Sequence, residues 1–444
     1  MIPSGWLLLV QATVVTVGPG GDHATVGAAL AAARPGDTVR VAAGVYRERP
    51  VIERPVVLLG DSGAVLDGGG EGIVLTVTAA ATVRGFAVRG SGRRQAAEHA
   101  GLLATGAPDL VIEHNRFEDV LFGIYLKQCD RAVIRHNIVT GADVDVPLRG
   151  DGIRLWYSHD GIIADNRVRD VRDVVIWFSN RARVVRNEVR RSRYGLHYMY
   201  SNHSVFEDNA FTDNHVGAFL MYSTDITFRR NLFAEARGTT GRGLGFKDAD
   251  RITAEENVLV KNAVGISLDN SPHSIGVTNY FRDNIVAWND VGVSLLPSVR
   301  DNAFTGNTFL DNLRPVVVTG GGTALANHWA RNFWSGYAAF DTDDDGIGDS
   351  PFVYARLSDD LLARHEDLAV FALSPAAETI DLLGRIVPLL EPRPVVIDSA
   401  PRMTAALPAA AGERSTGPAI AFVAAAIVAA ALAVHARRPF RGAA

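Results

Sequence analysis

The sequence predicts an all-β chain that folds as a right-handed parallel β-helix, with an N-terminal helical cap and one C-terminal transmembrane helix. Three observations predict this: an asparagine that returns every 21 to 29 residues, an apolar alternation in step with it, and an uncharged run near the end. Such self-similarity is typical of a solenoid. We expect a short, atypical signal peptide at 1–12, the β-helix at 13–354, a tail or linker at 355–417 and the membrane helix at 418–436.

The recurring asparagine marks one turn of each predicted coil. Asparagine tolerates left-handed backbone, and its amide can bond the asparagine of the neighbouring rung, so we expect a stacked ladder. A glycine in the same phase, such as Gly195 or Gly217, fits a turn that needs a positive φ. The asparagines are Asn115, Asn137, Asn166, Asn187, Asn209, Asn231, Asn257, Asn284, Asn307 and Asn332.

Apolar residues alternate in register with the asparagine. The positions 13 and 11 residues before it are almost purely apolar, as Leu196 and Tyr198 illustrate for Asn209. A spacing of two places both residues on the inward side of one strand. Each repeat therefore describes one rung of a parallel β-helix, and successive rungs should stack about 4.8 Å apart.

The N-terminal end of the β-helix needs a cover. Residues 23–34 (HATVGAALAAAR) are rich in alanine and favour a helix, with Asp22 as its N-cap. An uncovered rung would expose its apolar interior and its strand edges. We therefore expect this helix to cap the open end of the solenoid.

Both termini carry apolar segments. Residues 6–10 are apolar and precede a small-residue cleavage pattern, but no basic residues precede them, so a signal peptide there would be atypical. Residues 418–434 (PAIAFVAAAIVAAALAV) are uncharged, and Arg437, Arg438 and Arg441 follow. Basic residues on that side favour a cytoplasmic C-terminus, which places the rest of the chain outside the membrane. A buried alanine-rich helix is the alternative.

The composition excludes some classes of function. The net charge of −5 and the isoelectric point of about 6.2 argue against a nucleic-acid-binding protein. Cys129 is the only cysteine, so no internal disulfide can form. It aligns with Ser158, Ser179, Ser201 and Ser223, eight residues before each asparagine, which indicates a structural turn position.

Several segments resemble known families. Residues 35–46 (PGDTVRVAAGVY) and 58–70 (LLGDSGAVLDGGG) resemble the first coils of pectate-lyase-like right-handed β-helix proteins, the pectin lyase fold. Residues 150–168 (GDGIRLWYSHDGIIADNRV), 194–204 (YGLHYMYSNHS) and 332–354 (NFWSGYAAFDTDDDGIGDSPFVY) resemble NosD-type proteins. These are extracytoplasmic β-helix partners of an ABC transporter in copper-site maturation of nitrous oxide reductase.

The resemblance implies a non-catalytic accessory subunit that docks client reductase or a copper chaperone during this step of denitrification. The implied partners are the ABC transporter permease and ATPase, nitrous oxide reductase, a copper chaperone lipoprotein and, through the C-terminal helix, the membrane. The implied location is the periplasm or the outer face of the cell membrane. A C-terminal transmembrane helix is not required of a free periplasmic member, so it indicates tethering.

Outward positions of the middle coils are unusually apolar and soft. The residues 12 and 10 places before the asparagine point away from the core by alternation, and many are aromatic or methionine. An exposed patch of this kind usually marks a partner surface. Cover by an insertion loop or by the tail is the alternative. The predicted docking residues are Arg154, Trp156, Trp177, His197, Met199, Phe219 and Met221.

Three of these residues suit copper. His197 and Met199 lie two residues apart on one strand face, and Met221 lies one rung away. Imidazole and thioether groups suit Cu(I). Histidine and methionine at a docking surface also serve in packing alone, so the copper site and simple packing both stay open.

An acidic loop ends the predicted β-helix. Asp341, Asp343, Asp345 and Asp349 spell D-x-D-x-D-G-x-x-D, with the Ile347 carbonyl at position seven. These oxygen ligands fit a structural calcium loop, although Phe352 stands where an EF-hand has glutamate. A polar turn that closes the last coil is the alternative.

A carbohydrate-active enzyme is the alternative function, as a polysaccharide lyase, hydrolase or epimerase. Asp151, Arg154, His159, Asp160 and Asp173 cluster in the sequence, and paired carboxylates on adjacent rungs can hydrolyse glycosides. The chain lacks the G-H-G of polygalacturonases and the D-P-H-E of mannuronan epimerases.

Overall fold

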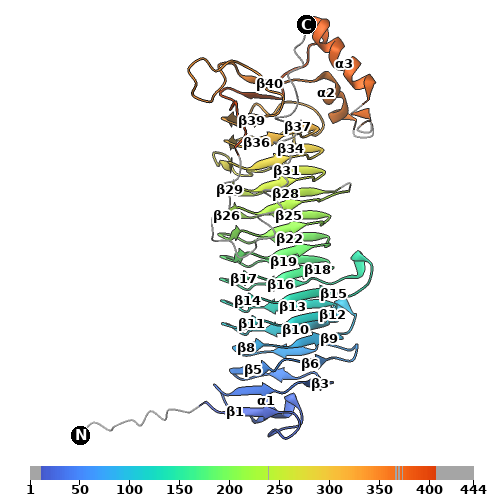
Figure 1. Cartoon of the computed structure of the whole chain (residues 1–444), viewed down its shortest axis with the longest axis vertical. Coiled ribbons are helices and arrows are strands. Elements are labelled where there is room, and N and C mark those ends of the chain that lie inside the picture. Colours follow the sequence, from blue (N-terminus) through green and yellow to red (C-terminus); the bar gives the residue numbers. More distant parts are fainter. Residues whose placement is uncertain (1–11, 239, 366–367, 369–370, 373, 407–444) are drawn as a thin grey trace, which may run out of the picture. The chain divides into compact units, whose positions relative to one another are not determined.

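The computed structural model describes residues 12–406 except 239, 366–367, 369–370 and 373 (Figure 1). The chain divides into an N-terminal unit that ends at Arg172 and a C-terminal unit that begins at Asp173. The predicted membrane helix at 418–436 and nearly all of the predicted signal peptide at 1–12 lie outside the described residues. Within the described part of the chain, no helix is long and apolar enough to cross a membrane.

Each unit is a right-handed parallel β-solenoid, which confirms the predicted all-β fold (Figure 1). Every complete coil supplies one strand to each of three parallel sheets, here called sheets 1, 2 and 3. In the N-terminal unit, sheet 1 contains β1 (Val14–Val17), β2 (Thr38–Val41), β5 (Val56–Gly60), β8 (Ala81–Arg84), β11 (Val111–Glu113), β14 (Val133–Arg135) and β17 (Ile162–Ala164). Sheet 2 contains β3 (Gly44–Tyr46), β6 (Ala64–Asp67), β9 (Ala87–Arg89), β12 (Arg116–Val120), β15 (Ile138–Gly141) and β18 (Arg167–Arg169). Sheet 3 contains β4 (Val51–Ile52), β7 (Leu75–Val77), β10 (Ala100–Thr105), β13 (Phe122–Lys127) and β16 (Ile153–Trp156).

The C-terminal unit repeats the same plan. Sheet 1 contains β20 (Arg183–Val185), β23 (Val205–Glu207), β26 (Thr224–Arg229), β29 (Asp250–Glu255), β32 (Asn279–Arg282), β35 (Asn302–Thr305) and β38 (His328–Ala330). Sheet 2 contains β21 (Glu188–Arg190), β24 (Ala210–Thr212), β27 (Leu232–Ala234), β30 (Val258–Val260), β33 (Ile285–Ala287), β36 (Thr308–Leu310) and β39 (Phe333–Trp334). Sheet 3 contains β19 (Asp173–Trp177), β22 (Tyr194–Met199), β25 (Val216–Met221), β28 (Arg242–Lys247), β31 (Val264–Asp269), β34 (Val291–Leu295) and β37 (Arg314–Val318).

The predicted inward rows form the core. Leu196 and Leu220 are fully buried, as alternation on a strand requires. Aromatic side chains stack from rung to rung along the interior, with ring centroids 4.6 Å apart for Phe206 and Phe228 and 4.7 Å apart for Phe281 and Phe304. Such offset stacks add to the stabilisation from burial alone.

The asparagines form the predicted ladder. Within the C-terminal unit, Asn187 donates from its backbone N and from Nδ2 to Asn209 Oδ1, at 2.9 and 3.0 Å. Asn209 repeats both bonds with Asn231. The left-handed residue of each turn is the one before the asparagine, such as Asp208 with φ of 55°. The expectation that asparagine itself takes this conformation was therefore wrong, because its task is to bond the next rung.

The glycines in phase with the ladder serve a purpose different from the predicted one. Their φ angles are not positive, yet a Cβ on Gly195 would lie 2.5 Å from the carbonyl oxygen of Gly217. A Cβ on Gly217 would lie 2.4 Å from the carbonyl oxygen of Gly243. Glycine is needed here because adjacent rungs approach too closely for any side chain.

The N-terminal helix α1 (Val26–Ala32) lies beside β1 and β2 at the N-terminal end of its unit (Figure 1). It buries Val26, Ala29 and Leu30. Its N-cap is Thr25, whose hydroxyl accepts from Ala28 N at 3.2 Å. The prediction of Asp22 as N-cap was wrong, because the Asp22 carboxylate instead binds the backbone N and the hydroxyl of Thr16.

The chain after β39 returns to the last coils of the C-terminal unit. The later elements are β40 (Phe352–Tyr354), α2 (Leu357–Arg364), α3 (Pro375–Ile386) and β41 (Val396–Asp398). Strand β41 pairs antiparallel with β40, and Ala363 of α2 packs against Val291 and Val317. The described part of the stretch expected as a tail or linker is therefore folded onto the solenoid. Short 3₁₀ turns occur at Gln95–Ala97, Val146–Leu148 and Pro388–Leu390.

Candidate functional site

The candidate site lies on the outer face of sheet 3 in the C-terminal unit. The parallel register pairs Trp177 with Met199 and Met199 with Met221. The row beside it pairs Val175 with His197 and His197 with Phe219. The structure thus brings Trp177, His197, Met199, Phe219 and Met221 onto three neighbouring strands.

A buried carboxylate organises one end of this face. Asp173 accepts a hydrogen bond from Arg193 Nε at 2.9 Å, and the second guanidinium donor, Arg193 Nη2, also contacts it. His197 Nδ1 lies 3.3 Å from Asp173 Oδ2. Burial raises the pKa of the Asp173 carboxyl, but the bonds from His197 and Arg193 outweigh it, so this pKa lies below its usual value. Asp173 is therefore an anion that orients the imidazole.

The His197 ring is enclosed by aromatic side chains. Tyr194 stacks on it at a centroid distance of 4.8 Å, and Trp177 meets it edge-on at 5.0 Å. His197 is only 9% exposed. Its Nε2 is buried and has no hydrogen-bond partner among the described residues. Because Nδ1 faces a carboxylate, a neutral ring with its proton on Nδ1 would leave the lone pair on Nε2, which is the arrangement that histidine metal ligands use.

An exposed aromatic ladder runs directly beside the methionines. Phe178 stacks on Tyr200 at 5.1 Å, and Tyr200 stacks on Tyr222 at 4.9 Å. All three take left-handed backbone, and Tyr200 is 46% exposed. Sequence reasoning missed this ladder, although its members stand nine residues before Asn187, Asn209 and Asn231. We call this surface the aromatic–methionine edge: Trp177, Phe178, Met199, Tyr200, Met221 and Tyr222.

The aromatic–methionine edge ends at the rung after Met221, where polar residues occupy the equivalent outward positions. Met221 pairs with Lys247, which in turn pairs with Asp269. Lys247 Nζ lies 3.0 Å from Asp269 Oδ2. Beyond Met221, the row thus continues as an ordinary solvated ion pair between Lys247 and Asp269.

The other predicted docking residues, Arg154 and Trp156, lie in the N-terminal unit. Arg154 binds the fully buried Asp151 at 3.2 Å, and its guanidinium lies over the rings of Tyr125 at 4.8 Å and Trp156 at 5.3 Å. Burial raises the pKa of Tyr125 to about 12, so its ring stays neutral under the cation. Asp151 also accepts from Arg172 Nε at 3.0 Å. Arg154 therefore serves a buried network rather than a free surface.

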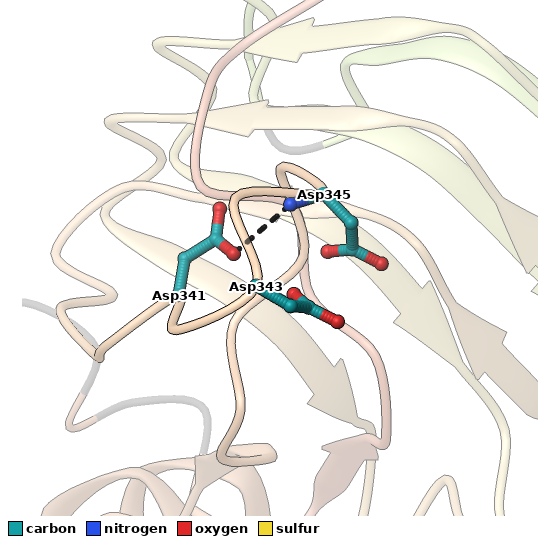
Figure 2. Close-up of side chains that lie close together, drawn as sticks. All are labelled: Asp341, Asp343 and Asp345. Carbon is teal, nitrogen blue, oxygen red and sulfur yellow. Dashed lines mark hydrogen bonds between the residues drawn. The ribbon is translucent and has the colours of Figure 1, made fainter.

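The acidic loop brings together three of its four predicted aspartates (Figure 2). Carboxylate oxygens of Asp341, Asp343 and Asp345 lie within 4.8 Å of one another. Asp341 also accepts from Asp345 N at 3.2 Å, the bond drawn in Figure 2. Asp349 lies outside this group and accepts from Thr342 N at 3.0 Å. Ile347 N donates to Asp345, and the calcium role of the loop stays a prediction.

Comparisons with known proteins show which family the chain is similar to. Residues 137–339 match the family model described as periplasmic copper-binding protein (NosD). The chain is 31% identical over 407 residues to a probable ABC transporter binding protein NosD of Pseudomonas aeruginosa, which covers 83% of this chain and 89% of that protein. A protein of the same description from Stutzerimonas stutzeri is 27% identical, over 82% of this chain and 86% of the relative.

Among solved structures, the fold is similar to the A-module of the mannuronan C-5 epimerase AlgE6 from Azotobacter vinelandii. The TM-score is 0.51 at 14% sequence identity, over 68% of this chain and 93% of that module. At this identity the likeness concerns the fold alone.

Proposed function

Because the chain belongs to the NosD family, we propose that it is a non-catalytic, extracytoplasmic accessory subunit of an ABC transporter. It docks the client reductase or a copper chaperone during copper-site maturation of nitrous oxide reductase. The observation that carries this proposal is the aromatic–methionine edge beside His197, since it places the large rings of Tyr200 and Tyr222 at the exposed surface. The partners are the transporter, the reductase and the chaperone.

The aromatic–methionine edge has the composition of a protein-binding surface. Interfaces are enriched in aromatic residues and methionine, and their strongest contacts are rigid aromatic anchors. Stacking between Phe178, Tyr200 and Tyr222 holds these rings in place before a partner arrives. Preorganisation of this kind lowers the entropic cost of association.

His197, Met199 and Met221 form the site on this chain where Cu(I) would be held as cargo. The donor set of one imidazole and two thioethers suits Cu(I). The orphaned, buried Nε2 of His197 supports a ligand role, because a buried polar atom otherwise needs a hydrogen-bond partner. Asp173 fixes the tautomer and the orientation of the ring.

The carbohydrate-active alternative is less well supported. A glycosidase needs two carboxyl groups that reach the substrate and exchange protons. Asp151 is fully buried and bound by Arg154 and Arg172, and Asp173 is 1% exposed and bound by Arg193. Each carboxylate is committed to a cation within its own unit, which favours a structural role.

The acidic loop is a candidate structural Ca²⁺ site. Three carboxylates in close proximity repel one another, and a hard cation would relieve that repulsion. Addition of Ca²⁺ to the chelator-treated protein should raise its melting temperature, and Asp343→Asn should abolish the increase. An unchanged melting temperature with Ca²⁺ would leave only a polar turn.

Binding of the partners tests the docking role. Trp177→Asp combined with Met199→Asp should weaken binding to apo nitrous oxide reductase or to the copper chaperone by more than about tenfold, because the two substitutions remove an aromatic and a thioether anchor from adjacent rungs of the edge. Lys247 lies one rung beyond Met221 in the same row and provides the matched control. The Lys247→Ala variant should bind these partners normally. Unchanged binding by the double variant would sink the docking proposal.

Cu(I) affinity tests the metal site separately. In competition with a chromophoric Cu(I) chelator, Met199→Leu, Met221→Leu and His197→Gln should each weaken binding, while Met403→Leu should not. Leucine keeps the volume of methionine, so the fold should persist. Wild-type affinity in all three variants would assign these residues to packing alone.

A further inference from the structure

Helix α3 (Pro375–Ile386) lies at the C-terminal end of the solenoid, outside its coils (Figure 1). The residues that it buries are Ala377, Asp381 and Gly384, none of which has a large apolar side chain. Five large apolar side chains of α3 and of the 3₁₀ turn that follows it are instead 42–93% exposed. We call this surface the leucine face: Leu382, Leu383, Ile386, Leu389 and Leu390.

The Asp381 carboxylate fixes the orientation of α3. Its Oδ1 accepts from Ser358 N at 2.9 Å, and its Oδ2 accepts from Arg356 Nε at 2.7 Å. Burial raises the pKa of the Asp381 carboxyl, but the bonds from Ser358 and Arg356 outweigh it, so this pKa lies below its usual value. Turning the leucine face toward the solenoid would require breaking this buried ion pair, so the leucine face stays outward.

This orientation is the reverse of the usual one, because a surface helix normally buries its apolar side and exposes its polar side. Leu382, Ile386 and Leu389 follow one another at spacings of four and three residues. That spacing is typical of a helix that binds a partner through one side. An exposed apolar patch of this kind marks an interaction surface.

Two opposite charges flank the leucine face. Glu378 lies in the first turn of α3 and Arg385 in its last turn, and both are exposed. They are seven residues apart, which is about two helical turns, so both lie on the same side of the helix as Leu382. Among the residues that the structure describes, neither side chain has an ion-pair partner.

This pattern is complementary to itself. In an antiparallel pair of α3 helices whose two-fold axis passes between Asp381 and Leu382, Glu378 of each copy is level with Arg385 of the other. A two-fold contact uses the same surface on both copies, so it requires charges arranged in this way. The Leu382 side chains of the two copies then meet near the axis, between the two ion pairs.

We propose that the leucine face is the contact surface for a second copy of this chain, formed by antiparallel pairing of two α3 helices. The balance of charge favours this partner over a lipid surface, because helices that lie on membranes are usually rich in lysine and arginine. The exposed charged residues of α3 are one glutamate and one arginine. The inference is independent of the docking and copper roles of sheet 3.

Disulfide cross-linking tests the proposal in the full chain, with Cys129→Ser as background. Under mild oxidation, Leu382→Cys should give at least about tenfold more disulfide-linked dimer than Leu148→Cys, because the two-fold axis brings the two thiols together. Leu148 is the matched control, since it is an exposed leucine that lies in the N-terminal unit. Equal cross-linking at the two positions would overturn the proposal.

Reversal of the charges tests the pairing itself. Added to Leu382→Cys, Glu378→Arg or Arg385→Glu alone should lower the yield of dimer, because each places like charges opposite one another. The two changes together should restore the yield. If these residues served only the dipole of their own helix, the double variant would be the least favourable of the three, and equal or lower yield in it would contradict the pairing.

Protection from labelling separates a protein partner from a lipid surface. Vesicles of phosphatidylcholine and phosphatidylglycerol should not slow the reaction of Leu382→Cys with a water-soluble maleimide. Protection by these vesicles without any disulfide-linked dimer would assign the leucine face to a lipid surface and overturn the proposal. Retention of the melting transition in each variant confirms that the solenoid is folded.

Discussion

The two units share an interior but differ on the outside of sheet 2. In the N-terminal unit, the outward positions include Arg116 and Glu118 on β12, which pair with each other, and Arg167 and Arg169 on β18. In the C-terminal unit, the same positions carry apolar residues such as Val258 and Val260. Inward residues are apolar in both. The inward residues specify the coil, and the outward residues can differ between the units. The outward residues therefore determine which partners bind.

Sheet 3 shows the same contrast. In the N-terminal unit, Lys127 forms an ion pair with Glu98 on the outer face, and Trp156 on the next rung lies under the guanidinium of Arg154. In the C-terminal unit, the corresponding positions of the first rungs hold tryptophan and methionine. The contrast predicts that substitutions of inward residues destabilise the two units equally, whereas substitutions of outward residues affect the two units differently.

Core substitutions should have the largest effect and should not distinguish the units. Phe117 and Phe233 are matched, since both point inward from sheet 2 and both are fully buried. Phe117→Ala and Phe233→Ala should each lower the free energy of unfolding by about 3–5 kcal/mol, because each leaves a cavity. Denaturant unfolding measures this, and a much smaller loss in one unit would break the shared-interior account.

Substitution of outward isoleucines should lower the free energy of unfolding by different amounts in the two units. Ile138 and Ile285 each follow a ladder asparagine and begin a strand of sheet 2, but Ile285 is only 4% exposed. Ile285→Lys should cost about 2–4 kcal/mol because it buries a charge, whereas Ile138→Lys should stay within about 0.5 kcal/mol. Equal losses in thermal or denaturant unfolding would contradict the difference between the two exteriors.

The in-phase glycines should again behave alike. A Cβ at Gly123 would lie 2.3 Å from the Gly152 carbonyl oxygen, and one at Gly217 would lie 2.4 Å from that of Gly243. Gly123→Ala and Gly217→Ala should each cost about 1–3 kcal/mol through overpacking of adjacent rungs. If either substitution were neutral in unfolding experiments, close approach of the rungs would not be the reason for glycine there.

The smallest effect is expected at the cysteine. Cys129 Sγ bonds the carbonyl oxygen of Lys127 at 3.2 Å, just as Ser201 Oγ bonds that of Met199 at 2.9 Å in the other unit. Cys129→Ser should therefore change the free energy of unfolding by less than about 0.5 kcal/mol. Burial raises the pKa of the Cys129 thiol, so the native protein should also resist alkylation. Rapid native labelling would show that this turn is open.

The fold was predictable because the asparagine period sets the register of every inward residue. The ladder from Asn187 to Asn332 and the buried rows confirm that reading. The roles of individual turn residues were harder to predict from the sequence. Period alone cannot tell a positive φ at Gly217 from close contact with the next rung, nor the capping role of Thr25 from that of Asp22.

The site was only partly predictable. Alternation predicts that His197 and Met199 share a face with Met221, and the register agrees. The bond between Asp173 and His197 was not foreseen, because it joins neighbouring strands through a register shift. Tyr200 and Tyr222 were missed because they lie in turns, where period-two alternation does not apply.

Methyl NMR of the methionines tests the central claim most directly. Met403, whose backbone N donates to the carbonyl oxygen of Gly346 near the last coil, lies outside the aromatic–methionine edge and serves as the internal control. On titration with apo nitrous oxide reductase, the methyl signals of Met199 and Met221 should shift or broaden while that of Met403 stays unchanged. Perturbation of Met403 alone, or of none of the three, would contradict docking on the aromatic–methionine edge.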